Sequence, residues 1–213
     1  MAMTFSALVA DETVSGSIKR LINWSRIDSE SILEDAQAWI YSKVRVRQMM
    51  TTANVTISSA ASTASFPTGY LDPIHFGIPG YVNTLRLKDA EWFRSHLGWD
   101  QDAVLPEGIP SYWCDIAETI QLDTKADQAY TAKLVYFKTP TALSVSNETN
   151  WLTIKYPHLV RHVCRMFAAI ERKEMDTVQM AELRAYQTID EIKIESDLAM
   201  RGWEADMNWQ EAG

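Results

Sequence analysis

Within residues 130–170, YTAKLVYFKTPTALSVSNETNWLTIKYPHLVRHVCRMFAAI, the hydrophobic pattern changes from that of a strand to that of a helix. Apolar and polar residues first alternate, as in a strand with one buried face. The apolar positions of this strand are Tyr130, Ala132, Leu134 and Tyr136. Thr139-Pro140 ends the strand. Pro157 then marks a helix start, because its missing N–H costs nothing in the first turn, so the two periods predict an α+β fold.

Two amphipathic helices are predicted after this change, because apolar residues recur at every third or fourth position. The buried stripe of the first is Leu159, Val163, Met166, Phe167 and Ile170. The second begins at a cap formed by Asp176 with Gln179. Its stripe is Val178, Ala181, Ala185, Ile189, Ile192 and Ala199. Gly202 is its predicted stop, which leaves residues 203–213, WEADMNWQEAG, as an extended tail.

The N-terminal part of the chain is also predicted to be helical. Residues 4–10 and 16–25 each indicate a short helix, and residues 31–49 indicate a longer one. Ser31 with Glu34 forms a capping-box pattern at its start. The predicted buried face is Leu33, Ala36, Ile40 and Val44.

A β-rich insertion separates the two helical blocks. Residues 51–66 predict a strand or an ordered loop, and prolines and glycines interrupt residues 66–80 repeatedly. Residues 81–88 predict another strand. Residues 111–138 predict an antiparallel β-meander with one buried face, with turns at Ala117-Glu118 and at residues 124–127.

The order of elements predicts a helical bundle built from N- and C-terminal helices, with an inserted antiparallel β-meander and an extended C-terminal tail. We expect one domain over residues 1–213. Its predicted parts are N-terminal helices (1–50), a β-rich insertion (51–140), C-terminal helices (141–202) and a C-terminal arm (203–213).

Composition and charge narrow the function classes. The formal net charge is −8, which argues against gripping nucleic acid, because affinity for phosphates comes mostly from Lys and Arg. Residues 171–211 hold eleven acids and five bases, so most of the excess lies near the C-terminus. We see no secretory signal and no apolar run long enough for a transmembrane helix. Cys114 and Cys164 are predicted to be buried free thiols, consistent with a reducing compartment.

A search for chemistry yields no catalytic, cofactor or metal site. His158 and His162 are four residues apart and would share a helix face, but no third ligand stands out nearby. Nucleophile and phosphate-binding motifs do not occur. The carboxylates Asp115, Glu118 and Asp123 lie near predicted turns and are interpreted as solvated hairpin residues. We therefore predict a protein that is not an enzyme.

The tryptophans carry more information, because Trp is enriched at protein interfaces. Trp24, Trp39, Trp113 and Trp151 can be explained as core residues. Trp203 and Trp209, with Met207 between them, lie in a polar tail without core periodicity. We interpret this tail as an arm that becomes ordered on a partner. The alternative is a tail that folds back onto its own subunit.

Several ordered motifs indicate a family resemblance. They follow the helix at 31–49 in this order: FPTGYL at 66–71, GIPSYW at 108–113, TIQL at 119–122, LVYF at 134–137, LS at 143–144, TNWL at 149–152 and YP at 156–157. In their order and spacing the chain resembles the head-to-tail adaptor (connector, or head-completion) proteins of tailed bacteriophages, especially short-tailed ones. One departure is DTK at 123–125, where family members often carry prolines.

The resemblance implies a structural virion protein that forms a ring of twelve copies beneath the portal of the filled head. The implied partners are identical copies, the portal protein, tail-nozzle or tail-fibre proteins, and DNA passing through the channel; no membrane or cofactor is implied. The implied location is the virion neck, after assembly in the host bacterial cytoplasm. Family adaptors often send a C-terminal arm to the portal, and Trp203, Met207 and Trp209 suit that contact.

Two alternatives remain at this point. A tail-tube or tail-terminator protein also forms a ring, but its fold would be mostly β. A tail-associated cell-wall hydrolase would need a pair of carboxylates in a cleft, and the sequence offers no candidate pair.

Overall fold

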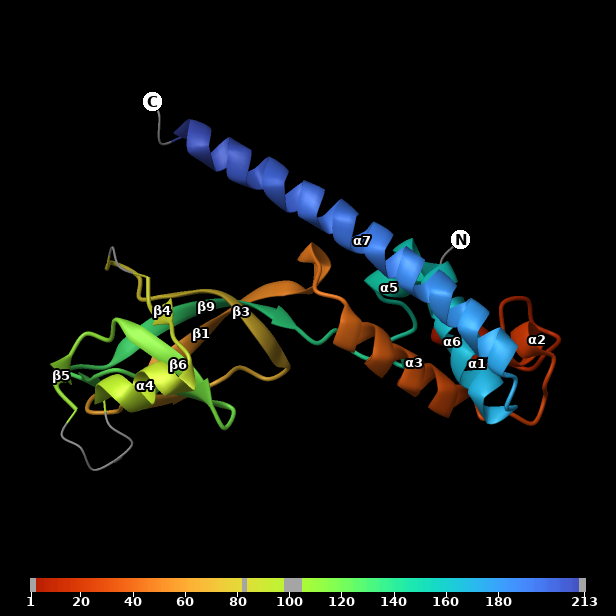
Figure 1. The fold of residues 1–213 in the computed structure, drawn as a ribbon, viewed down its shortest axis with the longest axis horizontal. Helices are drawn as coiled ribbons and strands as arrows, with labels where there is room; N and C mark the ends of the chain where they lie inside the picture. The colour runs from red at the N-terminus through yellow and green to blue at the C-terminus, as the bar shows by residue number, and fades with distance from the viewer. Residues whose placement is uncertain (1–2, 82–83, 98–104, 211–213) are drawn as a thin grey trace. The chain divides into compact units, whose positions relative to one another are not determined.

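The computed structural model describes residues 3–81, 84–97 and 105–210, with side chains for all of these except Leu97 and residues 200–210. The chain divides into two compact units (Figure 1). The helical unit comprises Met1–Met49 with Pro140–Gly213, and the β unit comprises Met50–Thr139.

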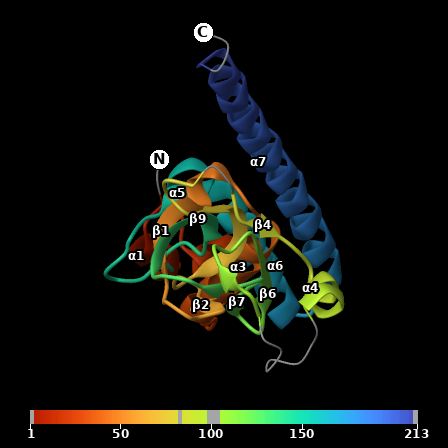
Figure 2. The same ribbon diagram turned by 90° about the vertical axis from the view of Figure 1, so that its left-hand side faces the viewer.

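The helical unit is organised around one central helix. Its elements are α1 (Phe5–Val9), α2 (Ile18–Ile22), α3 (Ser29–Lys43), the 3₁₀ turn η1 (Arg47–Met49), α5 (Trp151–Lys155), α6 (Pro157–Glu171) and α7 (Met175–Gln210). α6 packs against α2, α3, α5 and α7 (Figures 1 and 2). This confirms that the N- and C-terminal helices pack together.

Apolar burial holds these helices in place. The fully buried side chains include Leu33 and Ile40 of α3, Val160 and Val163 of α6, and Ala185 and Ile189 of α7. Each large aliphatic side chain contributes about 1.5–3 kcal/mol when it leaves water. The small side chains on α7 let its backbone come close to α6.

Hydrogen bonds also join the two ends of the sequence. The amide of Phe5 donates to the Glu148 carbonyl at 2.8 Å. Gln37 is buried on α3, where its Oε1 accepts from the backbone N–H of Leu143 at 2.8 Å and its Nε2 donates to the Leu33 carbonyl at 3.3 Å. This amide therefore satisfies backbone groups from both halves of the unit.

The start of α3 corrects one prediction. The helix begins at Ser29 and its cap is Asp28, whose Oδ1 accepts from the amides of Glu30 and Ser31. The capping box predicted at Ser31 and Glu34 is therefore wrong, because Asp is an equally good cap and comes earlier in the chain. The helix also ends at Lys43, before residue 49.

The end of α7 corrects a second prediction. Gly202 does not stop the helix, which runs to Gln210, so the predicted tail is helical in its backbone up to that residue. A glycine inside a helix costs only about 1 kcal/mol relative to alanine, and the residues that follow Gly202 tolerate a helix. Two residues of the predicted stripes, Ile170 and Ala199, are exposed.

The β unit has its own elements. They are β1 (Met50–Ile57), β2 (Thr63–Ser65), β3 (Tyr70–Gly77), β4 (Arg86–Leu87), α4 (Ala90–Leu97), β5 (Glu107–Gly108), β6 (Tyr112–Ile116), β7 (Thr119–Leu122), β8 (Lys125–Ala126) and β9 (Tyr130–Lys138). In the described residues they form three sheets with the strand orders β1-β9-β3, β2-β7-β6-β4 and β5-β8.

The predicted meander is only partly right. Ala117 and Glu118 form the β6–β7 turn, and both have a positive φ, as two-residue hairpin turns often require. β9 buries one face as expected but does not pair with β7. β8, which lies between β7 and β9 in the sequence, pairs with β5. β9 pairs with β1 and β3 instead. The strands predicted as one meander thus lie in separate sheets.

Two further elements differ from the prediction. The proline-rich stretch contains β3, an edge strand whose register shifts between Pro73 and His75, where a missing N–H is tolerated. The helix α4 was not predicted. Among the described residues of 81–88, the predicted strand is reduced to β4 and an isolated bridge at Thr84.

The core of the β unit explains two of the sequence motifs. Trp113, from the motif at 108–113, is buried and meets the rings of Phe66 and Phe76 edge-on. Phe66 also stacks on Tyr70 at 4.0 Å between ring centroids. Gly69, between these two aromatic residues, has a φ of 78°, which favours glycine. The motif at 66–71 is therefore a tight turn that places two rings on the Trp113 core.

The Gln37→Leu variant tests the cross-link between the halves of the helical unit. The substitution leaves the buried N–H of Leu143 without an acceptor, so we expect a loss of about 1–3 kcal/mol in unfolding free energy. Chemical denaturation measures this loss. The matched control is Gln187→Leu, the same exchange at an exposed position of α7, which should change stability by less than about 0.5 kcal/mol. Equal stability of the two variants would contradict the role assigned to Gln37.

Candidate interaction surface

The helix α7 has two apolar faces. The inward face is buried against the rest of the unit. The outward face carries four exposed side chains: Met180 (56% exposed), Leu183 (55%), Ile194 (60%) and Leu198 (63%). At about 100° per residue, these four positions fall within about 60° of one another, opposite the buried stripe. We call them the outward stripe.

The outward stripe is a candidate contact for another molecule. Exposed apolar side chains that gather on one helix face, here as two pairs separated by Gln187, Asp190 and Glu191, commonly mark an interaction site. Each such side chain would contribute about 1.5–3 kcal/mol on full burial, before the entropic costs of association. The sequence contains a signal for this surface, the spacings of three and four residues within the pairs 180/183 and 194/198, but the prediction made no use of it.

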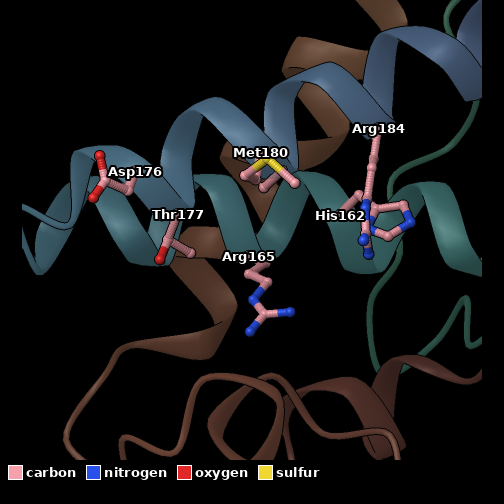
Figure 3. Close-up of a pocket in the computed structure, with 7 residues that line it drawn as sticks. His162, Arg165, Asp176, Thr177, Met180 and Arg184 are labelled. Carbon is pink, nitrogen blue, oxygen red and sulfur yellow. The ribbon is translucent and has the colours of Figure 1, made fainter.

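A second surface feature is basic. α6 and α7 enclose a shallow cavity of about 290 Å³. Its lining residues are His162, Arg165, Asp176, Thr177, Met180, Ala181 and Arg184 (Figure 3). Arg184 descends from α7 and lies beside the ring of His162, whereas Arg165 points away from α7 (Figure 3). We call Arg161, His162, Arg165 and Arg184 the basic patch.

The electrostatics of this patch disfavour a charged imidazole. Burial lowers the pKa of His162 below its ordinary value of 6.5, and the positive charge of Arg184 lowers it further. His158, Arg165 and Arg161 act in the same direction. The predicted pairing of His158 with His162 therefore places a second imidazole near a group of cations. Within the described residues, no cluster of three or more potential ligands is arranged to hold a metal ion.

The two cysteines and the carboxylates near the predicted turns lie in environments set by the surrounding fold. Burial raises the pKa of the Cys164 thiol to about 12 and also raises that of Cys114, so both thiols remain protonated near neutrality. Burial, and then the charge of Glu118, raise the pKa of Asp115. Asp123 accepts a hydrogen bond from the Ser111 amide at 3.0 Å, which joins the two strands of the β6–β7 hairpin at its open end.

The tryptophans predicted as core differ in burial. Trp113 is fully buried, whereas Trp24, Trp39 and Trp151 are half-buried. Trp39 of α3 meets Tyr186 of α7 edge-on, with 5.4 Å between ring centroids. The side chains of Trp203, Met207 and Trp209, predicted to contact the portal, lie outside the described residues, so that assignment remains a prediction.

The chain matches a known protein family over nearly its whole length. The model of the SU10 adaptor protein family matches residues 3–207, and the chain therefore belongs to that family. The match confirms the resemblance to phage head-to-tail adaptors that the sequence motifs indicated. No curated protein matches the chain. In the part of the chain that the structure describes, no helix is long and apolar enough to span a membrane.

Family membership carries a coarse functional conclusion. The chain is a phage adaptor, a structural protein that joins head and tail components. This disfavours the tail-tube and cell-wall hydrolase alternatives. It leaves open which surfaces make the contacts, and the outward stripe and the basic patch are the candidates that the geometry offers.

The environment of His162 predicts a pH dependence of stability. Because the pKa of this group is lower in the folded chain, the unfolded chain binds a proton first as the pH falls. The stability contributed by neutral His162 is present above about pH 6.5 and is lost below it. Between pH 7 and pH 5, roughly, His162→Gln should therefore lose less unfolding free energy than the natural chain. Parallel pH profiles in denaturation experiments would contradict this assignment.

Proposed function

We propose that this chain is a ring subunit of the virion neck, which assembles beneath the portal of the filled head and presents a docking platform to the tail. The observation that carries the proposal is the outward stripe of α7. A monomer gains nothing by exposing four large apolar side chains along one helix face. Identical neighbours packed side by side would remove these side chains from water.

The length of α7 supports this arrangement. The helix has 36 residues and α6 has 15, so α6 can cover only part of α7. Among the described side chains of α7, the last buried one on the inward face is Ser196. In this proposal the part of α7 that follows Ser196 contacts a neighbour or the portal. The proposed copy number of twelve is taken from the family resemblance.

The net charge suits a channel for DNA. Each chain carries −8, so a closed ring would be strongly negative and would repel a duplex that passes through it. In this proposal the ring retains and passes DNA without gripping it. The ring would assemble in the host bacterial cytoplasm, where packaging takes place.

The end of α7 is proposed as the portal contact. Trp203 and Met207 are four residues apart, the spacing of one helix face, and the backbone is helical there. A large aromatic side chain at such a position is the kind of residue that anchors an interface. Trp209 follows near the end of the helix.

A charge substitution in the outward stripe tests ring formation. In Leu183→Glu/Leu198→Glu, a carboxylate would enter each apolar contact, so we expect at least about a tenfold loss of rings on purified portal. Negative-stain microscopy and native mass spectrometry measure the rings. Thermal stability should change little, because both positions are exposed. Val145→Glu, a control at an exposed apolar residue outside α7, should assemble normally. Normal rings in the double variant would refute the role of the stripe.

Removal of residues 203–213 tests the portal contact. We expect portal affinity to fall at least about tenfold, because the predicted anchors are lost. Removal of residues 211–213 alone is the control. The full-length variant Trp203→Ala/Trp209→Ala separates loss of the anchors from shortening of the helix. If both the truncated chain and this variant bind portal as tightly as the natural chain, the contact lies elsewhere.

A further inference from the structure

The exposed face of α6 is unusual for an acidic protein. Its exposed or half-buried positions from His158 to Arg165 carry only His158, Arg161, His162 and Arg165. The only acid on the helix is Glu171, at its C-terminal end. Arg184 adds a further positive charge from α7 (Figure 3). Like charges this close repel one another, which costs free energy in the isolated subunit.

The arginines of the basic patch form no ion pair with the acids that the structure describes. Among the described residues, no ion pair joins Arg161, Arg165 or Arg184 to a carboxylate. Asp176 lines the same cavity and lies toward the start of α7, away from Arg184 (Figure 3). The patch is thus open to an external group of negative charge.

The opposite side of α7 carries two acids near Tyr186. Arg184 and Tyr186 are two residues apart and point about 200° apart around the helix. Arg184 lines the cavity beside α6, whereas Tyr186 meets Trp39 of α3. Acids lie four residues from these aromatic residues along each helix: Asp35 before Trp39, and Glu182 and Asp190 on either side of Tyr186.

These residues form what we call the acidic strip: Asp35, Trp39, Glu182, Tyr186 and Asp190. Residues four apart on a helix share one face, so the acids flank the aromatic pair. Lys43 lies four residues after Trp39 in the last turn of α3, and Lys193 lies three residues after Asp190 in the middle of α7, so the acidic strip ends there. The strip and the basic patch lie at the same level of α7, since Glu182 and Arg184 are only two residues apart.

We infer that the basic patch of one copy receives the acidic strip of the next copy in the ring. This inference rests on the proposed ring. A contact between two different surfaces of identical subunits repeats from copy to copy and closes into a ring when the rotation allows it. Each copy then neutralises one neighbour's arginines and offers its own patch to the other neighbour.

The two surfaces match in apolar character as well as in charge. The cavity contains Met180, which also belongs to the outward stripe. The acidic strip has the half-exposed Trp39–Tyr186 pair at its centre, and a methionine sulfur packs favourably on aromatic rings. An apolar centre with a charged rim is the usual organisation of a protein interface. Phosphate groups of DNA would satisfy the arginines but not Met180, so a protein surface fits this site better.

Charge reversal on each side tests the pairing. Arg161→Glu/Arg165→Glu reverses the patch, and Glu182→Lys/Asp190→Lys reverses the strip. Each double variant should form rings on portal at least about tenfold less well than the natural chain. The four-fold variant restores opposite charges across the contact, so its rings should return to within about threefold of the natural yield. Arg94→Glu/Lys133→Glu, at exposed positions of the β unit, is the matched control.

The outcomes separate this inference from the proposed function. If the natural chain forms no ring, the proposed function fails. If it forms rings and both double variants do so equally well, the ring stands and the pairing is refuted. If the two double variants lose rings but the four-fold variant does not recover them, the pairing is also refuted. If the patch variant keeps its rings but loses DNA retention in filled heads, the patch contacts phosphate instead. Circular dichroism of each variant verifies folding.

Discussion

The burial of α6 by helices from both ends of the sequence is the constraint on which this structure depends. α2 and α3 come before the β unit and α7 comes after it, and all three pack on α6. The chain must therefore return to the helical unit after the β unit of residues 50–139. Loop closure becomes costlier only slowly with length, so a long insertion is tolerated. The antiparallel pairing of β1 with β9, from Met50 opposite Phe137 onward, brings the two ends of the insertion together.

The surfaces available for assembly follow from the same packing. A helix as long as α7 cannot be covered by the shorter α6, and its apolar residues occupy two opposite faces. One face completes the core of the subunit, and the other remains exposed. Arg184 on one side of α7 and Glu182 on the opposite side differ in sign, which gives the subunit two different edges at this level of the helix. These are properties expected of a protein that completes its burial only among its own copies.

Local patterns predicted the helices and strands better than their partners. Most of the buried residues of α6 and α7, and the helix start at Pro157, could be predicted from the sequence. Helix periodicity and capping depend only on residues a few positions apart. The pairing of β9 with β1 could not be predicted, because about eighty residues separate the two strands and many partner strands fit one alternating pattern. Asp28 and Ser31 were equivalent as caps, and only the structure separates them. Nor does spacing alone distinguish an apolar residue of the core from one of an interface, so Leu183 and Ile194 were missed.

The double connection of the β unit has a mechanical consequence. Two chain segments, on either side of Met50 and of Thr139, join this unit to the helical unit. A pull on the β unit is shared between two covalent tethers, and a single cut in either tether leaves the other intact. The β1–β9 ladder begins at these tethers with Met50 opposite Phe137, so both tethers leave the unit at the same end of the ladder. The β unit thus stays attached to the helical unit unless both tethers are cut.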